Sequence, residues 1–312
     1  MSEEYRGFDR QFSDEMLEKL KADPLFKNYL LPDITCLPAV KHAAINRVFP
    51  AIREGRIDFY HRGGKLFSFG RRGFTTHMKY AASFKKDAKK STEITQEELR
   101  DLELIRDFES GYPDIKALCK LYAEREACGV SEIYGLFSFV TASPFFVVLD
   151  IEASFDARLR PEAENDQDRI DLVLFDVAAK SLLFVEAKRF GNSDIRASSG
   201  NTPAVVAQIV RYRDQIVGQE KHILSAYAQY VAAMNDLFDL KLPPPETIVP
   251  EIPLLIFEYD DAHERGPLKV RKKVIEDAKV CCLTIGKPSD LHFERGVATL
   301  ASWFKKARAW KR

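Results

Sequence analysis

Apolar residues recur along the chain in two rhythms, one typical of helices and one typical of strands. Near the N-terminus Met16, Leu17 and Leu20 stand at helical spacing, and the first fifty residues are expected to be mostly helical. From Arg56 the apolar positions form short runs separated by glycine-containing turns, which predicts a meander of strands. The runs are RIDFYH (56–61), KLFSF (65–69) and FTTHMKY (74–80).

The middle of the chain returns to the helical rhythm and then changes to strands. Residues 95–128 read as helix, with Thr95 and Glu98 at the spacing of a capping box. Three apolar strand patterns then follow in close order, which favours a three-stranded antiparallel unit. They are FFVVLDIEASF (145–155), RIDLVLFD (169–176) and SLLFVEAKRF (181–190).

A long helix and further strands complete the pattern. Thr202 is expected to cap a helix with Pro203 at its first position, and the helical rhythm continues past Gly218 towards Phe238. The proline-rich LPPPETIVPEIP leads into an apolar strand at 254–259, and the strand KVCCLTI precedes a last helix. From residue 113 the order is helix, three strands, helix, strand, and the fold class is therefore expected to be α/β.

Two of the strand patterns bring acidic residues together. A hairpin in which Asp176 faces Ser181 also places Asp171 opposite Glu186, and strand alternation puts Lys188 on the same face. Two facing carboxylates repel each other unless one takes up a proton or a cation binds between them. Oxygen ligands at this spacing suit magnesium or manganese. A lysine beside such an ion would stabilise the charge that develops on a phosphate, so the pattern indicates phosphodiester hydrolysis.

This segment resembles the catalytic core of the PD-(D/E)XK nuclease superfamily. Gln208 and Tyr212, on the helix that follows, resemble the QxxxY motif of its RecB-like branch. The resemblance covers about residues 113–260, where the element order agrees with the superfamily's common core. It implies a restriction-endonuclease-like nuclease domain at residues 111–312. Residues 1–110 are then expected to be an N-terminal accessory region of helices and β-hairpins, partly basic and in contact with DNA.

The resemblance also implies a role for each matching residue. Asp171 and Glu186 would bind Mg²⁺ or Mn²⁺ with the carbonyl of Ala187, and Lys188 would be the catalytic lysine. Gln208 and Tyr212 would orient that lysine or contact the substrate phosphate. The catalytic set implied is Asp171, Glu186, Lys188, Gln208 and Tyr212.

Many members of the superfamily add an upstream acid to the metal site. Here Glu152, in the strand pattern LDIEASF, is the candidate, while Glu124 and Glu126 on the preceding helix are rivals. The chain departs from the family pattern in one respect, because Ile170 and not proline precedes Asp171.

Plainer interpretations remain open for the same residues. Asp171 and Glu186 would lie exposed at a sheet edge, with Lys188 as a solvated charge. Gln208 and Tyr212 would be ordinary helix surface and core. The function expected is that of a metal-dependent deoxyribonuclease of prokaryotic defence or repair, and two alternatives to it remain. One is a protein of nuclease-like fold that binds nucleic acid without cutting it, and the other is a metal-dependent ribonuclease.

Charge adds a second candidate surface. Lys plus Arg and Asp plus Glu both number 47, so the chain as a whole has no net charge with which to attract DNA. Residues 53–90, however, hold eleven Lys or Arg against three acids, a local net charge of +8. Aromatic residues are interleaved with these cations, which suits either base stacking or an ordinary hairpin core. They are Phe59, Tyr60, Phe67, Phe69, Phe74, Tyr80 and Phe84.

The remaining composition bears on location and partners. The five cysteines form no CxxC pair, and an odd count with an adjacent pair suits reduced thiols in the cytoplasm. The N-terminus MSEEYRGFDR is charged where a signal peptide would be apolar, and no apolar run is long enough to span a membrane. The chain has no GxxxxGK[ST] motif, so ATP-driven unwinding would require a partner protein.

Overall fold

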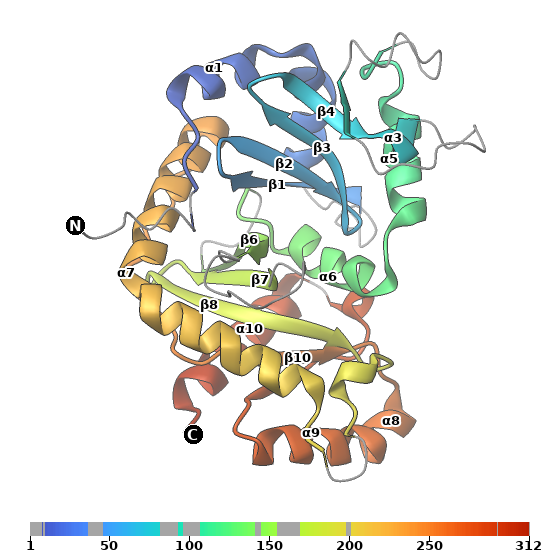
Figure 1. The fold of residues 1–312 in the computed structure, drawn as a ribbon, viewed down its shortest axis with the longest axis vertical. Coiled ribbons are helices and arrows are strands. Elements are labelled where there is room, and N and C mark those ends of the chain that lie inside the picture. Colours follow the sequence, from blue (N-terminus) through green and yellow to red (C-terminus); the bar gives the residue numbers. More distant parts are fainter. Residues whose placement is uncertain are drawn as a thin grey trace. The chain divides into compact units, whose positions relative to one another are not determined.

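The computed structural model describes most of the chain and divides it into two compact units (Figure 1). The described residues are 8, 10–36, 46–81, 93–95, 107–140, 145–154, 169–197, 201–291 and 293–311. The N-terminal unit comprises Arg10–Gly135 and Gln229–Lys241. The C-terminal unit comprises Met1–Asp9, Leu136–Ala228 and Leu242–Arg312.

The N-terminal unit is built on an antiparallel sheet of five strands in sequence order. The strands are β1 (Val48–Arg53), β2 (Arg56–His61), β3 (Gly64–Gly70), β4 (Gly73–His77) and β5 (Glu93–Thr95). Its helices are α1 (Asp14–Ala22), the π-helical turn η1 (Phe26–Leu30), α2 (Leu31–Thr35), α3 (Met78–Ala81), α5 (Tyr112–Tyr122) and α6 (Arg125–Leu136). The predicted meander is confirmed in β2, β3 and β4.

Three local expectations for this unit were wrong. β1 occupies residues 48–53, partly within the stretch expected to be helical. Thr95 ends strand β5 and does not cap a helix, while its expected partner Glu98 lies outside the described residues. Residues 111–312 were expected to form one domain, yet α5 and α6 belong to the N-terminal unit. One reason is the β2–β3 turn, where a Cβ on Gly63 would stand 2.5 Å from Ala127 of α6, so only glycine permits this packing.

The aromatic residues of the basic stretch form the core of the N-terminal unit. The rings of Phe59 and Phe74 lie 5.9 Å apart, and Phe67 packs against Phe108 of the chain before α5 at 5.3 Å. Six of the seven interleaved aromatics are buried, and Phe84 lies outside the described residues. The interpretation as a hairpin core is confirmed for these six, and base stacking on them was a wrong expectation because their rings are not accessible.

The C-terminal unit holds a mixed sheet with strand order β11-β10-β8-β7-β6, to which β9 adds by pairing with β8. The strands are β6 (Phe146–Ser154), β7 (Arg169–Asp176), β8 (Ser181–Arg189), β9 (Thr247–Ile248), β10 (Leu254–Phe257) and β11 (Cys282–Thr284). β6, β7 and β8 run antiparallel, as predicted, whereas β10 runs parallel to both β8 and β11. The central strand β8 therefore has neighbours on both edges, and eight of its nine residues are buried.

Long and short helices accompany this sheet. They are α7 (Ala204–Phe238), α8 (Asp261–Arg265), α9 (Pro267–Asp277), α10 (Phe293–Ala309) and the single 3₁₀ turns η4 (Ser193–Ile195) and η5 (Pro288–Asp290). α7 begins at Ala204, one residue later than expected, and continues through Gly218 to Phe238, as the sequence predicts. α8 and α9 were not anticipated. Helices and sheets together confirm the α/β class.

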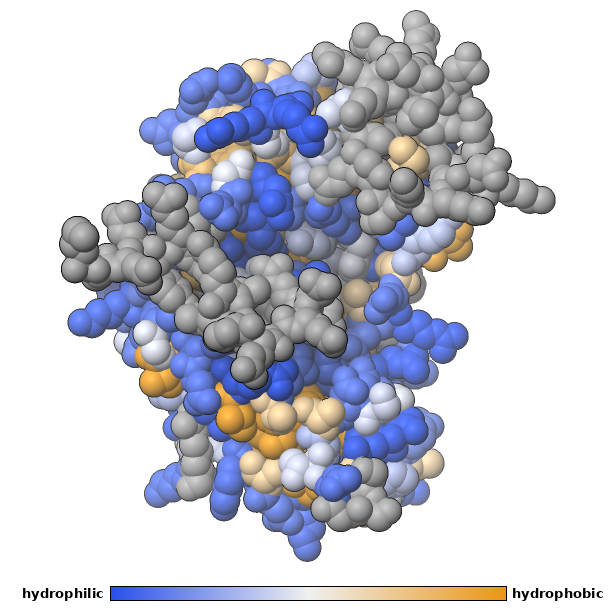
Figure 2. All heavy atoms as spheres, in the orientation of Figure 1, coloured by the Kyte–Doolittle hydropathy of each residue, from blue (hydrophilic) through white to orange (hydrophobic). Residues whose placement is uncertain are grey.

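The surface in Figure 2 is mostly hydrophilic, with one apolar patch in the lower part of the view. Exposed apolar side chains of the C-terminal unit include Val210 and Val217 on α7 and Val270 on α9. Isolated apolar side chains on a surface are ordinary, so they assign no function by themselves. All five cysteines are free thiols. In the described part of the chain, no helix is both long and apolar enough to cross a bilayer.

Candidate active site

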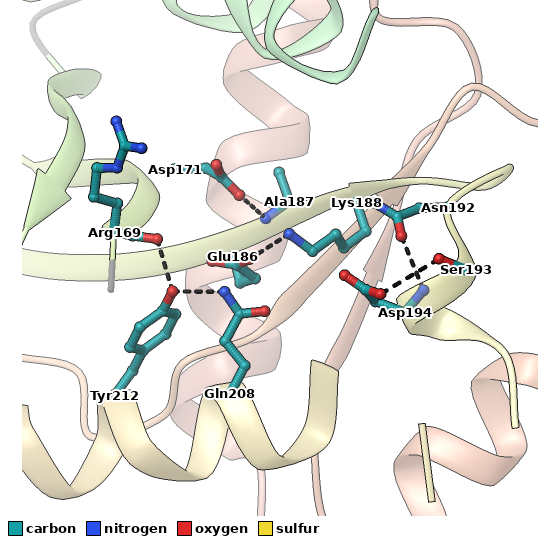
Figure 3. Close-up of polar contacts among 10 residues, drawn as sticks. All are labelled: Arg169, Asp171, Glu186, Ala187, Lys188, Asn192, Ser193, Asp194, Gln208 and Tyr212. Carbon is teal, nitrogen blue, oxygen red and sulfur yellow. Dashed lines mark hydrogen bonds and ion pairs between the residues drawn. The ribbon is translucent and has the colours of Figure 1, made fainter. Parts of the chain in front are cut away.

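The hairpin β7–β8 forms in the predicted register. Asp176 pairs with Ser181, and the pairing continues to Leu172 and Val185. One step further along, the N–H of Ala187 donates a 2.7 Å hydrogen bond to Oδ2 of Asp171 (Figure 3). A side-chain carboxylate thus takes the place that a backbone carbonyl of β7 would have in a regular ladder. This bond fixes the carboxylate of Asp171 beside β8.

Glu186 and Lys188 lie on the same face of β8, as strand alternation predicts. The Nζ atom of Lys188 stands 2.7 Å from Oε1 of Glu186, and the two side chains are 11% and 1% exposed. They are therefore not solvated charges at a sheet edge, and that plainer interpretation is wrong. A buried ion pair of this kind is weak evidence for added stability, since removing two charges from water costs about as much as their attraction returns.

The negative charges of neighbouring carboxylates act on the ionisation of Asp171. Its pKa is raised well above the ordinary range, first because burial disfavours the charged carboxylate and second because Glu186 is negative. Glu152 raises the pKa further, whereas Lys188 and the N–H of Ala187 lower it. The repulsion between carboxylates that the strand register predicts thus contributes to this shift, after burial. A proton or a cation would relieve it.

Glu152 on β6 is distinguished by its backbone. Its neighbours Ile151 and Ala153 pair with Leu172 and Ile170, so Glu152 stands opposite Asp171. The φ angle of Glu152 is +48°, a left-handed conformation that costs a non-glycine residue about 1 kcal/mol or more. This outlier lies between a shift of register on β6 and the end of the strand.

The charge of Glu152 is partly balanced by Arg169, whose Nη1 lies 3.2 Å from Oε2 of Glu152. The sequence offered no signal for Arg169 beyond its place two residues before Asp171. The rival upstream acids Glu124 and Glu126 belong to the N-terminal unit. Of the three candidates, Glu152 is the one whose charge raises the pKa of Asp171, and its role as a metal ligand stays a prediction.

Gln208 and Tyr212 lie one turn apart on α7 and form a chain of hydrogen bonds. Nε2 of Gln208 donates to the Tyr212 hydroxyl at 2.6 Å, and that hydroxyl donates to the carbonyl of Arg169 at 2.8 Å. Tyr212 is fully buried, so its ring is core while its hydroxyl fixes the start of β7. The chain ends two residues from Asp171, and its predicted action on Lys188 or on phosphate stays a prediction.

Asp150 is a buried acid close in sequence to this site, but its carboxylate accepts hydrogen bonds from other residues. Its Oδ2 accepts a hydrogen bond from the Tyr227 hydroxyl at 3.0 Å, and its Oδ1 accepts one from the N–H of Ile151 at 2.8 Å. A carboxylate held by two donors has a structural explanation. We therefore leave Asp150 out of the candidate site.

The donor chemistry of the site fits a hard divalent cation. Asp171 and Glu186 offer carboxylate oxygens and Ala187 a carbonyl, which are the ligand types that Mg²⁺ and Mn²⁺ prefer. A cation would also relieve the repulsion that raises the pKa of Asp171. Within the described ranges, no cluster of three or more His, Cys, Asp and Glu side chains is spaced to hold a metal. The metal site therefore stays a prediction that rests on two carboxylates.

The family resemblance rests on the residues of this site. It is carried by the hairpin β7–β8 and by Gln208 and Tyr212 on α7, and membership of the PD-(D/E)XK superfamily stays a prediction. Comparison of the chain with family models, with curated proteins and with solved structures finds no match.

Proposed function

We propose that this protein is a metal-dependent nuclease that hydrolyses DNA phosphodiester bonds with a restriction-endonuclease-like core. One observation carries the proposal. A buried strand holds Glu186 and Lys188 together, with Asp171 beside them and its pKa raised first by burial and second by the charge of Glu186. Perturbed carboxylates of this kind are characteristic of functional sites, because a structural role alone does not require like charges to be gathered.

The residues that would hold the ion are Asp171, Glu186 and the carbonyl of Ala187, with Glu152 as the upstream acid. When bound, Mg²⁺ or Mn²⁺ polarises a phosphate oxygen and lowers the pKa of a coordinated water. The hydrogen bond from Ala187 to Asp171 keeps one carboxylate oriented before the ion arrives. One proposed ligand is thus held in a fixed orientation by the protein itself.

Lys188 has two roles in the proposal. In the absence of an ion it offsets the charge of Glu186 across 2.7 Å. With phosphate present, its ammonium would stabilise the negative charge that grows on the phosphoryl oxygens during attack. Tyr212 and Gln208 act as positioning residues, because their bonds hold the backbone of Arg169 next to Asp171.

Cleavage assays test the activity directly. Closed-circular DNA, linear DNA and RNA are each incubated with purified protein in Mg²⁺, Mn²⁺ or EDTA. We expect DNA cleavage with either metal, and none in EDTA or with Asp171→Ala, Glu186→Ala or Lys188→Ala, each of which should stay folded by circular dichroism. Full activity of any one of these three variants would remove that residue from the mechanism. Binding without cleavage of any substrate would favour a non-cutting protein, and RNA cleavage alone would favour a ribonuclease.

The matched control is Lys180→Ala, at the other end of the same hairpin. Lys180 forms an ion pair of similar length, 2.6 Å to Glu246, but the two side chains are 41% and 60% exposed. The variant removes a lysine and an ion pair without touching the candidate site. Wild-type activity is expected, and a loss as large as that of Lys188→Ala would show that the hairpin is simply sensitive to charge removal.

Metal binding is testable without substrate. Mg²⁺ or Mn²⁺ should raise the melting temperature of the wild-type protein, because a ligand bound only by the folded state stabilises it by RT ln(1 + [L]/Kd). At a hundredfold excess over Kd the gain is about 2.7 kcal/mol. Asp171→Ala should show a much smaller shift. Equal shifts in the two proteins would mean that the ion binds at another site.

A further inference from the structure

Two arginine side chains are fixed to the backbone just beyond the end of β8. Nη1 of Arg271, on α9, donates a 2.6 Å hydrogen bond to the carbonyl of Phe190. Nη2 of Arg196, just after η4, donates a 2.8 Å hydrogen bond to the carbonyl of Gly191. In Figure 1 the arrowhead of β8 ends beside α8 and α9. Consecutive carbonyls of one short turn thus each hold one guanidinium group.

Arg271 is held firmly in this position. Its Cζ atom lies 4.0 Å from the centre of the Phe190 ring, which is buried and also packs against the ring of His263 at 4.4 Å. A guanidinium over an aromatic face is attracted by the ring quadrupole and loses rotamer freedom before any ligand arrives. Arg271 is therefore preorganised.

The two guanidinium groups are close enough to repel each other. The pKa of Arg271 is lowered, first because burial disfavours its charge and second because Arg196 is positive. A third cation nearby, Arg189, is balanced by Glu258, with 3.2 Å between Nε and Oε2. Among the described residues no carboxylate forms an ion pair with Arg196 or Arg271. Two adjacent cations without a counterion favour an anion that bridges them.

We propose that Arg196 and Arg271 bind one phosphate group of the nucleic-acid strand that the candidate active site cleaves. Each guanidinium has five N–H donors in a planar fork, and a single backbone bond leaves most of them for phosphate oxygens. This inference rests on the proposed nuclease function and adds to it a pair of residues that binds the substrate backbone.

The place of the pair along the chain fits a phosphate near the scissile one. Phe190 and Gly191 follow Lys188 by two and three residues, and because they form a turn after β8 they lie at most roughly 7–10 Å from it along the backbone. Each strand of B-DNA carries one phosphate per about 3.4 Å of helix axis. The bound phosphate would therefore lie close to the scissile one on the same strand, within about three nucleotides.

The test is DNA binding across a salt series, with Ca²⁺ in place of Mg²⁺ to limit cleavage. The variants are Arg196→Ala, Arg271→Ala, the double variant and Arg271→Lys, which keeps the charge and the stem over Phe190 but loses the fork. Lys273→Ala is the matched control, because Lys273 is an exposed cation two residues further on α9 and so on its opposite side. Duplexes with and without a 5′-phosphate separate a terminal from an internal phosphate. Melting temperatures confirm that each variant is folded.

We expect each alanine variant to bind duplex about tenfold more weakly, since a charge-assisted phosphate contact is lost. Because both arginines grip one phosphate, the double variant should be hardly weaker than either single variant. The slope of log K against log salt should become shallower by about 0.9 in each single variant, and by the same amount, not twice it, in the double variant. Arg271→Lys should show an intermediate loss, and Lys273→Ala should match the wild type. Dependence on the 5′-phosphate would assign the site to a strand end.

Other outcomes would overturn the proposal. Unchanged affinity and slope in the double variant, with normal DNA cleavage by the wild type, would reject the phosphate site and leave the nuclease function intact. Losses that simply add, each with its own change of slope, would mean two separate phosphate contacts. If the wild type neither binds nor cleaves nucleic acid, the nuclease function and this substrate contact both fail. A melting shift with inorganic phosphate alone, lost in the double variant, would then make the pair a site for free phosphate.

Discussion

Two aspartates, Asp58 on one sheet and the partly buried Asp171 on the other, have opposite surroundings. Asp58 on β2 is 2% exposed and its Oδ1 accepts hydrogen bonds from the Ser68 hydroxyl at 2.6 Å and from Nε of Arg56 at 3.0 Å. Asp171 on β7 accepts one hydrogen bond from Ala187 and faces the negative charges of Glu186 and Glu152. The first acid has donors and a cation, whereas the second has mainly other acids.

The difference shows how to tell a structural buried charge from a functional one. A fold that needs a buried carboxylate for stability surrounds it with donors, because an unsatisfied charge costs several kcal/mol. A site that must capture a cation keeps its carboxylates ionisable and close together at the expense of stability. By this criterion Asp58 fits a structural role, and Asp171 is the candidate for a functional one. Neither burial nor residue type alone separates the two.

The largest expected effect is on cleavage. Asp171→Asn removes a charged metal ligand while keeping an oxygen that can accept from Ala187, so we expect DNA cleavage to fall by about 10³-fold. Asp58→Asn should leave the rate per folded molecule within about twofold of wild type. Initial rates, normalised to the folded fraction measured by circular dichroism, check both. Similar losses of cleavage rate in the two variants would show that the surroundings of the two aspartates do not distinguish their roles.

Stability should respond with opposite signs. In EDTA, Asp58→Asn is expected to destabilise the protein by about 1.5–3 kcal/mol, because charge-assisted hydrogen bonds from Ser68 and Arg56 are weakened. Asp171→Asn should stabilise it by about 1 kcal/mol, since repulsion from Glu186 and Glu152 is relieved. Urea denaturation at pH 7, monitored by far-UV circular dichroism, measures the two changes, because both tryptophans lie in the C-terminal unit and would not report on Asp58. Destabilisation by Asp171→Asn would mean that its carboxylate is structural after all.

The smallest expected effect is the pH dependence of the stability that Asp171→Asn gains in EDTA. This effect arises from a single titrating group. The pKa of Asp171 is higher in the folded protein than in the unfolded chain, so the folded state holds the proton more tightly. The free energy of unfolding of the wild-type protein therefore decreases as pH rises above about 3.9, the pKa of aspartate in the unfolded chain. The decrease ends once the pH exceeds the pKa of Asp171 in the folded protein. The advantage of Asp171→Asn should grow over this window in EDTA. Saturating Mg²⁺ should abolish it, and a pH-independent difference would contradict the raised pKa.

How far the sequence could predict the site depends on the range of the interactions. The register that brings Asp171 next to Glu186 follows from local alternation and one short turn, and it was predicted correctly. Lys188 followed from the same alternation. The left-handed backbone of Glu152 lies in a strand whose pairing is irregular, and residue order gives no signal for either feature.

Tertiary packing explains the misses. β1 was not recognised because Pro50 lowers the strand signal of VFPAIR, although an edge strand tolerates it. Phe67 and Phe74 could have been stacking platforms or core, because the same residue types serve both uses, and only burial distinguishes them. Arg196 and Arg271 are 75 positions apart and meet through helix α9, which was not anticipated.

Helix α7 has a consequence for the order in which the protein is made. Its residues up to Ala228 belong to the C-terminal unit, whereas Gln229–Lys241 belong to the N-terminal unit. During synthesis, at about 5–20 residues per second, the five-strand sheet would leave the ribosome several seconds before the helical segment that completes its unit. The first half of the chain must therefore wait, incompletely packed, for residues made more than a hundred positions later. Folding during translation should be a vulnerable stage, at which slow elongation favours degradation.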